Sequence, residues 1–111
     1  AVQALGAVKL DVEDMDIDLM SMSAHKIYGP KGCGALYIRN GIKCSDLLDG
    51  GSQERKRRAG TINVPAVAGF GKAVEIATRD IIVNQQKIKT IRDYFVKQIN
   101  FFFRWFGIFN C

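Results

Sequence analysis

A dense cluster of chain-breaking residues, Gly29-Pro30-Lys31-Gly32, separates two short segments that read as β-strands. The segment before it, residues 18–23, mixes apolar residues with serines and predicts a short buried strand. The segment after it, residues 34–39, is rich in β-forming residues and ends at Asn40-Gly41, which predicts a second strand. Two strands joined by so short a loop most simply pair antiparallel.

The N-terminal part of the chain leads into the first of these strands. Residues 1–9 read as strand-like sequence and lack the charged leader or long apolar stretch of a targeting peptide. Residues 11–16 then carry four acids in six positions. This acidic segment predicts an exposed turn or a short helical connection before the strand.

A long polar loop follows the second strand. Residues 49–63 contain three glycines and show no apolar periodicity, and loops of this length inside compact proteins tend to be functional. From Pro65 onward, apolar residues recur at three- and four-residue spacings. The pattern predicts one long helix to about Asn100, or two helices with a break near residues 79–84.

Length and composition limit what the chain can do by itself. Its 111 residues are 48% apolar and 24% charged, which is typical of a soluble globular domain. Such a chain can bury one modest core, whereas a cofactor enzyme with a substrate cleft usually needs more chain. We therefore interpret residues 1–99 as one part of a larger domain.

The last stretch, residues 100–111, differs in composition from the rest of the chain. Six of its twelve residues are aromatic. It is too short to span a membrane, which takes about 20 apolar residues, although binding at a membrane interface is conceivable. We interpret it as a divergent aromatic tail whose apolar side chains lack their proper partners, and we expect no membrane association.

The net charge of +5 raises the question of a nucleic-acid partner, because phosphate backbones attract clustered basic residues. The densest basic cluster, residues 55–58, lies inside the glycine-bounded loop and has no aromatic residues between its charges. This placement favours a solvated loop or a small-anion site over a nucleic-acid interface.

The cysteines and the single histidine do not predict a metal site. Cys33, Cys44 and Cys111 form no CxxC pair, and their odd number does not suit a disulfide framework. No neighbouring pattern marks one of them as a nucleophile, because a reactive thiolate needs a nearby base or positive site. A reduced intracellular compartment, the cytoplasm, fits this composition best.

Lys26 is the strongest candidate for a catalytic residue. It follows the end of the first predicted strand and precedes the rigid turn at residues 29–32. A lysine held there can lose its proton when it is partly desolvated, and the neutral amine attacks aldehydes. On spacing alone, an ordinary surface lysine remains the favoured interpretation.

Two long runs of sequence change this interpretation of Lys26. The run Ser-Ala-His-Lys-Ile-Tyr-Gly-Pro-Lys-Gly-Cys-Gly-Ala-Leu-Tyr-Ile-Arg, residues 23–39, resembles the cofactor-lysine segment of cysteine desulfurases of the class V aminotransferase fold. The run at residues 50–65, with Gly-Gly-Ser-Gln-Glu-Arg and Arg-Ala-Gly-Thr-Ile-Asn, resembles a second loop of that family. The resemblance covers residues 1 to about 95. It implies an α/β fold in which residues 1–99 are the C-terminal part, a fragment, of the large cofactor-binding domain of a fold-type I enzyme.

The resemblance also implies roles for five residues. Lys26 matches the lysine that binds pyridoxal 5′-phosphate as a Schiff base and then moves protons at the substrate carbons. Ser23 and His25 match residues that hold the cofactor phosphate. Gln3 matches a glutamine that hydrogen-bonds the ring hydroxyl, and Thr61 matches a threonine that reaches the phosphate from the partner subunit of a homodimer.

The implied reaction releases sulfur from L-cysteine, giving L-alanine and an enzyme persulfide that serves a scaffold protein for iron–sulfur clusters or another thio-cofactor pathway. The family's pyridine-pairing aspartate, ring-stacking histidine, substrate arginine and catalytic cysteine have no counterpart in residues 1–111, so this fragment alone is expected to be inactive. Selenocysteine lyase or aminotransferase activity on the same scaffold is the alternative, and a small basic binding module is the non-enzymatic one.

Three positions depart from the family's pattern. Cys33 stands where the family usually carries a small apolar residue, so we expect it to pack rather than react. Ser52 and Lys56 replace glycines of the family's loop. Because glycine adopts backbone conformations that other residues avoid, these two replacements are expected to alter the loop's backbone freedom.

Overall fold

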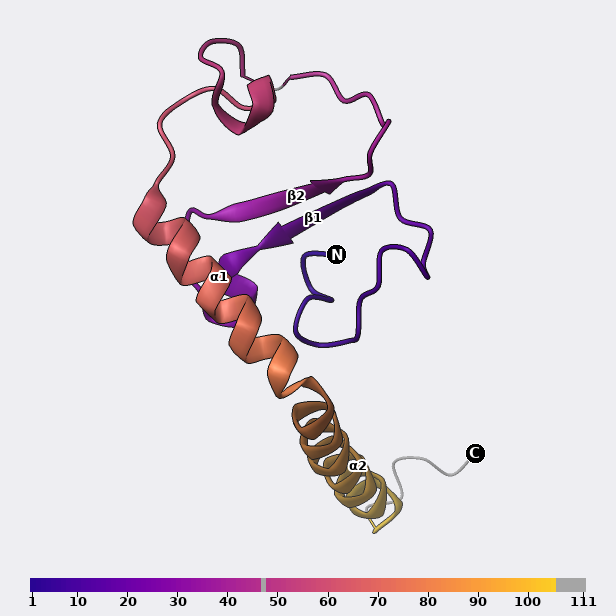
Figure 1. Ribbon diagram of the computed structural model, residues 1–111. Helices are drawn as coiled ribbons and strands as arrows, with labels where there is room; N and C mark the ends of the chain where they lie inside the picture. The colour runs from indigo at the N-terminus through magenta and orange to yellow at the C-terminus, as the bar shows by residue number, and fades with distance from the viewer. Residues whose placement is uncertain (47, 106–111) are drawn as a thin grey trace. The chain divides into compact units, whose positions relative to one another are not determined.

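The computed structural model describes residues 1–46 and 48–105, and residues 106–111 of the predicted tail lie outside this range. The chain divides into two compact units, the first spanning Ala1–Arg79 and the second beginning at Asp80 (Figure 1). This division into compact units does not test the predicted boundary between residues 99 and 100, which stays a prediction. Each unit is described in turn below.

The first unit contains the two predicted strands, and their pairing is confirmed. Strand β1 spans Leu19–Ser23 and strand β2 spans Gly34–Ile38. They pair antiparallel, with Met20 opposite Tyr37 and Ser23 opposite Gly34 (Figure 1). The breaker cluster therefore lies in the connection that reverses the chain direction.

The prediction that the first strand is buried is only partly right. Met20 is 8% exposed, but its neighbour Leu19 is 49% exposed. A two-stranded sheet leaves much of its surface uncovered unless other elements pack on it. Only one side chain of β1 is therefore removed from water in the described part of the chain.

The connection between the strands begins with a short 3₁₀ helix, η1, spanning Ala24–Ile27. The backbone N–H of Ala24 donates to the carbonyl of Cys33 at 3.0 Å, which ties the two ends of the connection together. Tyr28 ends η1 in a left-handed conformation with φ of 63°, and the N–H of Gly29 donates to the carbonyl of Ala24 at 2.9 Å. These bonds make the connection a closed and well-supported turn.

The prediction of a strand at residues 1–9 is wrong. The N–H of Leu5 donates to the carbonyl of Ala1 at 3.2 Å, and that of Val8 to Ala4 at 3.0 Å, so this segment forms successive helical turns. Alanine and leucine favour such local bonds, and a strand would have needed a sheet edge to pair with. Gly6, with φ of +75°, lies within these turns.

The acidic segment at residues 11–16 forms the predicted exposed turn. The Asp11 carboxylate accepts hydrogen bonds from the backbone N–H groups of Glu13 at 3.1 Å and Asp14 at 3.3 Å. An aspartate that bonds the backbone two and three residues ahead stabilises a turn by itself. These two hydrogen bonds therefore stabilise the turn.

Arg39, immediately after β2, anchors this acidic turn. Its Nη1 atom lies 2.6 Å from a carboxylate oxygen of Asp16 and 3.3 Å from one of Asp18. The hydrogen bond with Asp16 is the main cause that raises the pKa of the Arg39 guanidinium, and the charges of both carboxylates add to it. The turn before β1 and the residue after β2 are therefore joined.

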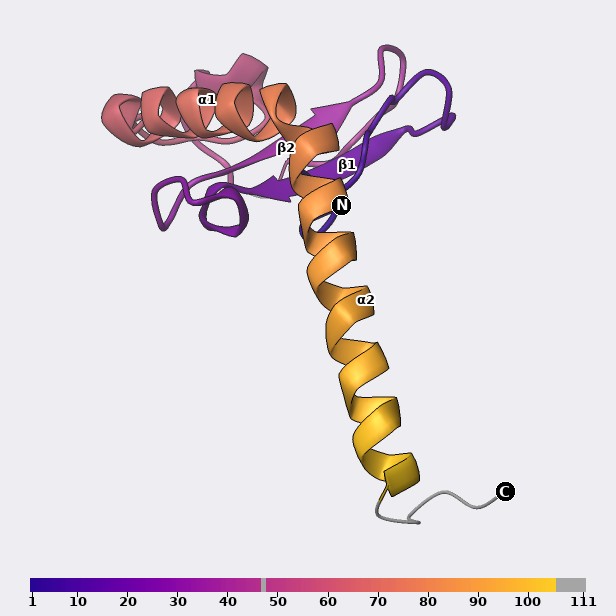
Figure 2. The same cartoon turned by 90° about the horizontal axis from the view of Figure 1, so that it is seen from below.

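Two helices follow the long loop. Helix α1 spans Val64–Arg79 and helix α2 spans Ile81–Trp105 (Figure 2). Asp80 separates them, which agrees with the predicted alternative of two helices with a break near residues 79–84. The second helix continues past Asn100, so the helical pattern extends beyond its predicted end.

The core of the first unit is small. Its buried members are Leu5, Ala24, Ile27 and Phe70, which come from the N-terminal turn, η1 and α1. Cys33 packs against this cluster with a half-buried side chain, as expected of a packing cysteine. The core therefore joins the segment around Lys26 to α1.

Helix α2 carries an ion-pair cluster on its own surface. Lys89 Nζ lies 2.9 Å from Asp93 Oδ2, and Arg92 Nη2 lies 2.6 Å from Asp93 Oδ1. The hydrogen bond from Lys89, followed by that from Arg92, lowers the pKa of Asp93.

Neither α2 nor any other described helix has the combination of length and apolarity that crossing a membrane requires.

Candidate functional site

The short helix η1 presents His25 and Lys26 to the outside of the fold. Ala24 is fully buried and Ile27 is 6% exposed, whereas His25 and Lys26 are both exposed. In a 3₁₀ helix, residues three apart lie on the same face, so burial of the first and last residues turns the middle two outward. The packing of two apolar side chains thereby orients the histidine and the lysine.

Partial desolvation of Lys26 stays a prediction, because this chain alone leaves the residue exposed. Its side chain is exposed, and no hydrogen bond or ion pair reaches its ammonium group from residues 1–46 or 48–105. A lysine held on a fixed backbone with an unengaged amine can bond covalently or ionically to an added molecule.

Ser23 and Gln3, the two other expected site residues of this region, lie on segments next to η1. Ser23 is the last residue of β1 and is half-buried, directly before η1. Gln3 is exposed on the N-terminal turn. This turn packs closely against η1, as shown by Gly6, where a Cβ would lie only 2.8 Å from Ile27 Cγ2. The fold thus gathers Ser23, His25 and Lys26 within four consecutive positions and brings the segment of Gln3 alongside.

Thr61 lies on a different part of the first unit. It is exposed on the loop that leads into α1. The described residues show no hydrogen bond between Thr61 and the segment of residues 23–26. Its expected role as a phosphate ligand from a partner subunit stays a prediction.

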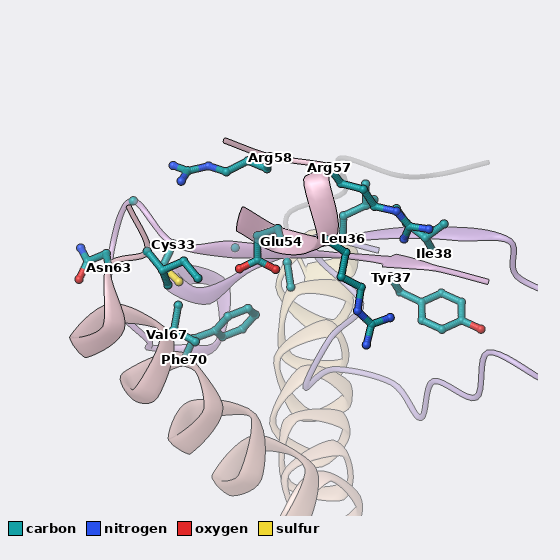
Figure 3. A pocket seen from close by; sticks show the side chains of 15 residues that line it. Cys33, Leu36, Tyr37, Ile38, Glu54, Arg57, Arg58, Asn63, Val67 and Phe70 are labelled. Carbon is teal, nitrogen blue, oxygen red and sulfur yellow. The ribbon is translucent and has the colours of Figure 1, made fainter. Parts of the chain in front are cut away.

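A pocket of the first unit is separate from these five residues. It has a volume of about 780 Å³ and lies between β2 and the loop that contains residues 54–63. Figure 3 shows Cys33, Val67 and Phe70 close together at one end of it, with Tyr37 and Ile38 toward the other. None of the expected site residues lines this pocket, so we do not assign the cofactor to it.

The predicted long loop contains a short and strained turn, η2, at Gln53–Lys56. Three successive residues have left-handed backbones, with φ of 49° at Glu54, 57° at Arg55 and 65° at Lys56. For residues with a Cβ this conformation costs about 1–2 kcal/mol each. The replacement of a family glycine by Lys56 therefore falls at a position where glycine would be free of strain.

Two hydrogen bonds close the same loop. The side-chain oxygen of Gln53 accepts from the N–H of Gly60 at 3.2 Å, and Arg58 Nη1 donates to the carbonyl of Gly60 at 3.1 Å. Arg58 thus supports the backbone next to Thr61. The basic cluster of residues 55–58 is exposed, which agrees with the prediction of a solvated loop.

Asn63 ends the loop and caps helix α1. Its side-chain oxygen accepts from the backbone N–H of Ala66 at 3.2 Å, and this bond satisfies an amide that has no partner inside the helix. We expect Asn63→Ala to lower the free energy of unfolding by about 1 kcal/mol, measured by urea denaturation. Asn63→Asp, which keeps a capping oxygen, is the control, and equal losses in the two variants would contradict the capping role.

One set of contacts near the lysine was not predicted from the sequence. Small residues of α1 contact the N-terminal turn and the connection that carries Lys26. A Cβ on Gly69 would meet Pro30, and a Cβ on Gly29 would meet Ala73. The signal that could have identified them is the repetition of glycine and alanine at four-residue spacing along one helix face.

Comparisons with known proteins agree with the resemblance in the two runs. Residues 1–102 match the family described as aminotransferase class-V, which extends further along the chain than the motifs indicated. A cysteine desulfurase IscS from Methanosarcina thermophila is 55% identical over 97 residues, covering 87% of this chain and 24% of that protein. The chain spans about a quarter of the length of the curated relatives it matches.

Solved structures resemble the chain as well. A NifS-like protein superposes with a TM-score of 0.85 at 39% identity, covering 89% of this chain and 27% of its own. A structure titled SspA in complex with cysteine superposes with a TM-score of 0.65 at 47% identity, covering 68% of this chain and 22% of its own. The solved structures agree with the fold class that the two runs imply. The chain belongs to the class-V aminotransferase family.

Proposed function

We propose that this chain is part of a pyridoxal-phosphate-dependent cysteine desulfurase. The observation that carries the proposal is the exposed pair His25 and Lys26, held on a turn by buried Ala24 and Ile27. This turn lies in a chain that is 55% identical to a protein named cysteine desulfurase. The neighbour solved with cysteine supports L-cysteine as the substrate.

The residues on this turn suit the cofactor that the family uses. A primary amine, an imidazole and a hydroxyl, those of Lys26, His25 and Ser23, lie within four positions, and neither His25 nor Lys26 is buried. The amine suits an aldehyde, while the other two groups are hydrogen-bond donors suited to a phosphate. No described carboxylate pairs with Lys26.

Each site residue then has a proposed task. Pyridoxal phosphate, when bound, supplies an electron sink for the carbon atoms of the substrate. Lys26 holds the cofactor covalently and later moves protons at the substrate carbons. Ser23 and His25 hold the phosphate, Gln3 donates to the ring hydroxyl, and Thr61 reaches the phosphate of the other subunit in a homodimer.

The partners follow from the same proposal. The released sulfur would be carried as an enzyme persulfide to a scaffold protein for iron–sulfur clusters or to another thio-cofactor pathway. We place the enzyme in the cytoplasm, because Cys33 and Cys44 are free thiols in the described part of the chain. Because the chain spans about a quarter of its relatives, we expect it to be inactive when isolated from the rest of the enzyme.

Borohydride reduction of the full-length enzyme tests the proposal. Reduction fixes the cofactor to the amine that holds it, and peptide mass spectrometry should find the added mass on Lys26. Attachment at any other lysine would overturn the assignment. A parallel assay with L-cysteine should yield sulfide or persulfide together with alanine, whereas turnover only of selenocysteine, or formation of a keto acid, would identify a different reaction on the same scaffold.

A further inference from the structure

The two neighbouring glycines of α1, Gly69 and Gly71, differ in what surrounds them. A Cβ on Gly69 would lie 2.8 Å from Cγ and 3.2 Å from Cδ of Pro30, whereas a Cβ on Gly71 would meet nothing within 4 Å. Carbon atoms in unstrained contact stay about 3.5–4.0 Å apart. The absence of a side chain at Gly69 is therefore what allows Pro30 to lie against the helix.

Pro30 lies on the same connection as the lysine. Its neighbour Gly29 donates a backbone hydrogen bond to the carbonyl of Ala24 at 2.9 Å, and Ala24 is the first residue of η1. A Cβ on Gly29 would lie 3.1 Å from the Cβ of Ala24 and 3.2 Å from that of Ala73 on α1. This glycine is thus enclosed between η1 and α1.

The connection has little capacity to absorb a displacement. The ring of Pro30 fixes its φ angle, and Gly29 is enclosed by neighbours on two sides. The N–H of Ala24 is also tied to the carbonyl of Cys33 at 3.0 Å. A shift imposed on the proline by α1 therefore passes along the connection to η1.

We propose that Gly69 is a positioning residue: its contact with Pro30 sets where η1, and with it the amine of Lys26, stands relative to the bound cofactor. The proposal rests on the proposed function, because it assumes that Lys26 holds the cofactor. An added methyl at position 69 displaces Pro30 or α1, and a displacement of about 1 Å in a reactive group lowers rates by about a hundredfold.

A pair of matched variants of the full-length enzyme tests this. Gly69→Ala and Gly71→Ala add the same methyl to the same helix, and only the first meets Pro30. We expect Gly69→Ala to lower kcat by about ten- to a hundredfold, with a smaller change in KM, while Gly71→Ala stays near the parent. We also expect Gly69→Ala alone to shift the pH midpoint at which the visible absorption of the bound cofactor changes. Equal kcat values and equal midpoints in the two variants would overturn the proposal.

Removal of the proline ring provides a rescue. Pro30→Ala deletes the Cγ and Cδ atoms that a methyl at position 69 would meet. Adding Gly69→Ala to Pro30→Ala should therefore change kcat by less than about threefold and the pH midpoint by less than a few tenths of a pH unit. An undiminished effect of Gly69→Ala in this background would show that the contact is not the cause. Should Gly69→Ala alone prove too unstable to purify, Pro30→Ala tests the same contact, and a parent-like kcat and midpoint would overturn the proposal.

The outcome separates this inference from the proposed function. Borohydride labelling of Lys26 is measured in every variant. A label on another residue in the parent enzyme removes the proposed function, and this inference with it. A label on Lys26 in all variants, with no difference between Gly69→Ala and Gly71→Ala, removes only the positioning role.

Discussion

Lys26→Ala in the full-length enzyme is expected to lower kcat for sulfur release from L-cysteine by about 10³-fold, because a positioned proton-transfer group contributes about 10²–10⁴-fold and, in the proposed function, this residue also holds the cofactor. The visible absorption that depends on covalent attachment of the cofactor should disappear as well. Both quantities are measured on protein reconstituted with saturating cofactor, so that weak binding alone does not produce the loss.

Two control variants define what the loss means. Lys26→Arg keeps a positive charge but offers no neutral amine, because a guanidinium does not deprotonate in proteins, and it should be as inactive as the alanine variant. Lys31→Ala removes another exposed lysine from the same connection and should leave kcat within about twofold of the parent. Retention of substantial activity by Lys26→Ala would contradict the role of this amine.

Phe70→Ala is expected to cause the largest loss of stability. Phe70 is 7% exposed and is the only aromatic member of the described buried cluster, which it joins from α1. Truncation of a buried phenylalanine costs about 3–5 kcal/mol, through lost transfer free energy and the cavity that remains. The unfolding free energy is measured by urea denaturation in the full-length background, with the slope compared between variants.

Val67→Ala serves as the matched control for this variant. Val67 lies one turn earlier on the same helix and is 49% exposed. Its truncation should cost less than about 1 kcal/mol, because little apolar area leaves contact with the interior. Similar losses in the two variants would indicate that α1 contributes through its helical backbone rather than through the buried ring.

The local features of the fold were predictable from the sequence. The breaker cluster at residues 29–32 lies between two segments of β-forming residues, and the resulting antiparallel pair needs only nearby chain. The break at Asp80 was visible as an interruption of the apolar period. Both signals are local, so they do not depend on which parts of the chain meet in space.

Features that depend on tertiary contact were not predictable in the same way. Residues 1–9 form turns rather than a strand, because their helix-forming residues are not paired at any sheet edge. The exposure of Lys26 was not predictable either, since it depends on which surfaces cover η1. The approach of Pro30 to Gly69 joins residues 39 positions apart, and the spacing of small residues along α1 marks a closely packed helix face without revealing which segment meets it.

The candidate site was identified from two runs of sequence rather than from spacing. A lone lysine after a strand is most often an ordinary surface residue, and the resemblance of residues 23–39 to the family's lysine segment supplied the assignment. The structure adds the reason for its orientation, which is the burial of Ala24 and Ile27 on either side. The left-handed run at Glu54–Lys56 had a partial signal, because Lys56 replaces a family glycine.

The contrast between a fixed backbone and an unengaged side chain at Lys26 has a consequence for timing. The backbone of η1 is held by hydrogen bonds at Ala24 and Gly29, while the lysine side chain is exposed and free to change rotamer. Rotamers of exposed side chains interchange in picoseconds to nanoseconds, whereas enzymes commonly turn over about 1–10³ times per second. In this chain the amine can therefore change its direction far faster than an enzyme commonly turns over, without any change in the backbone that carries it.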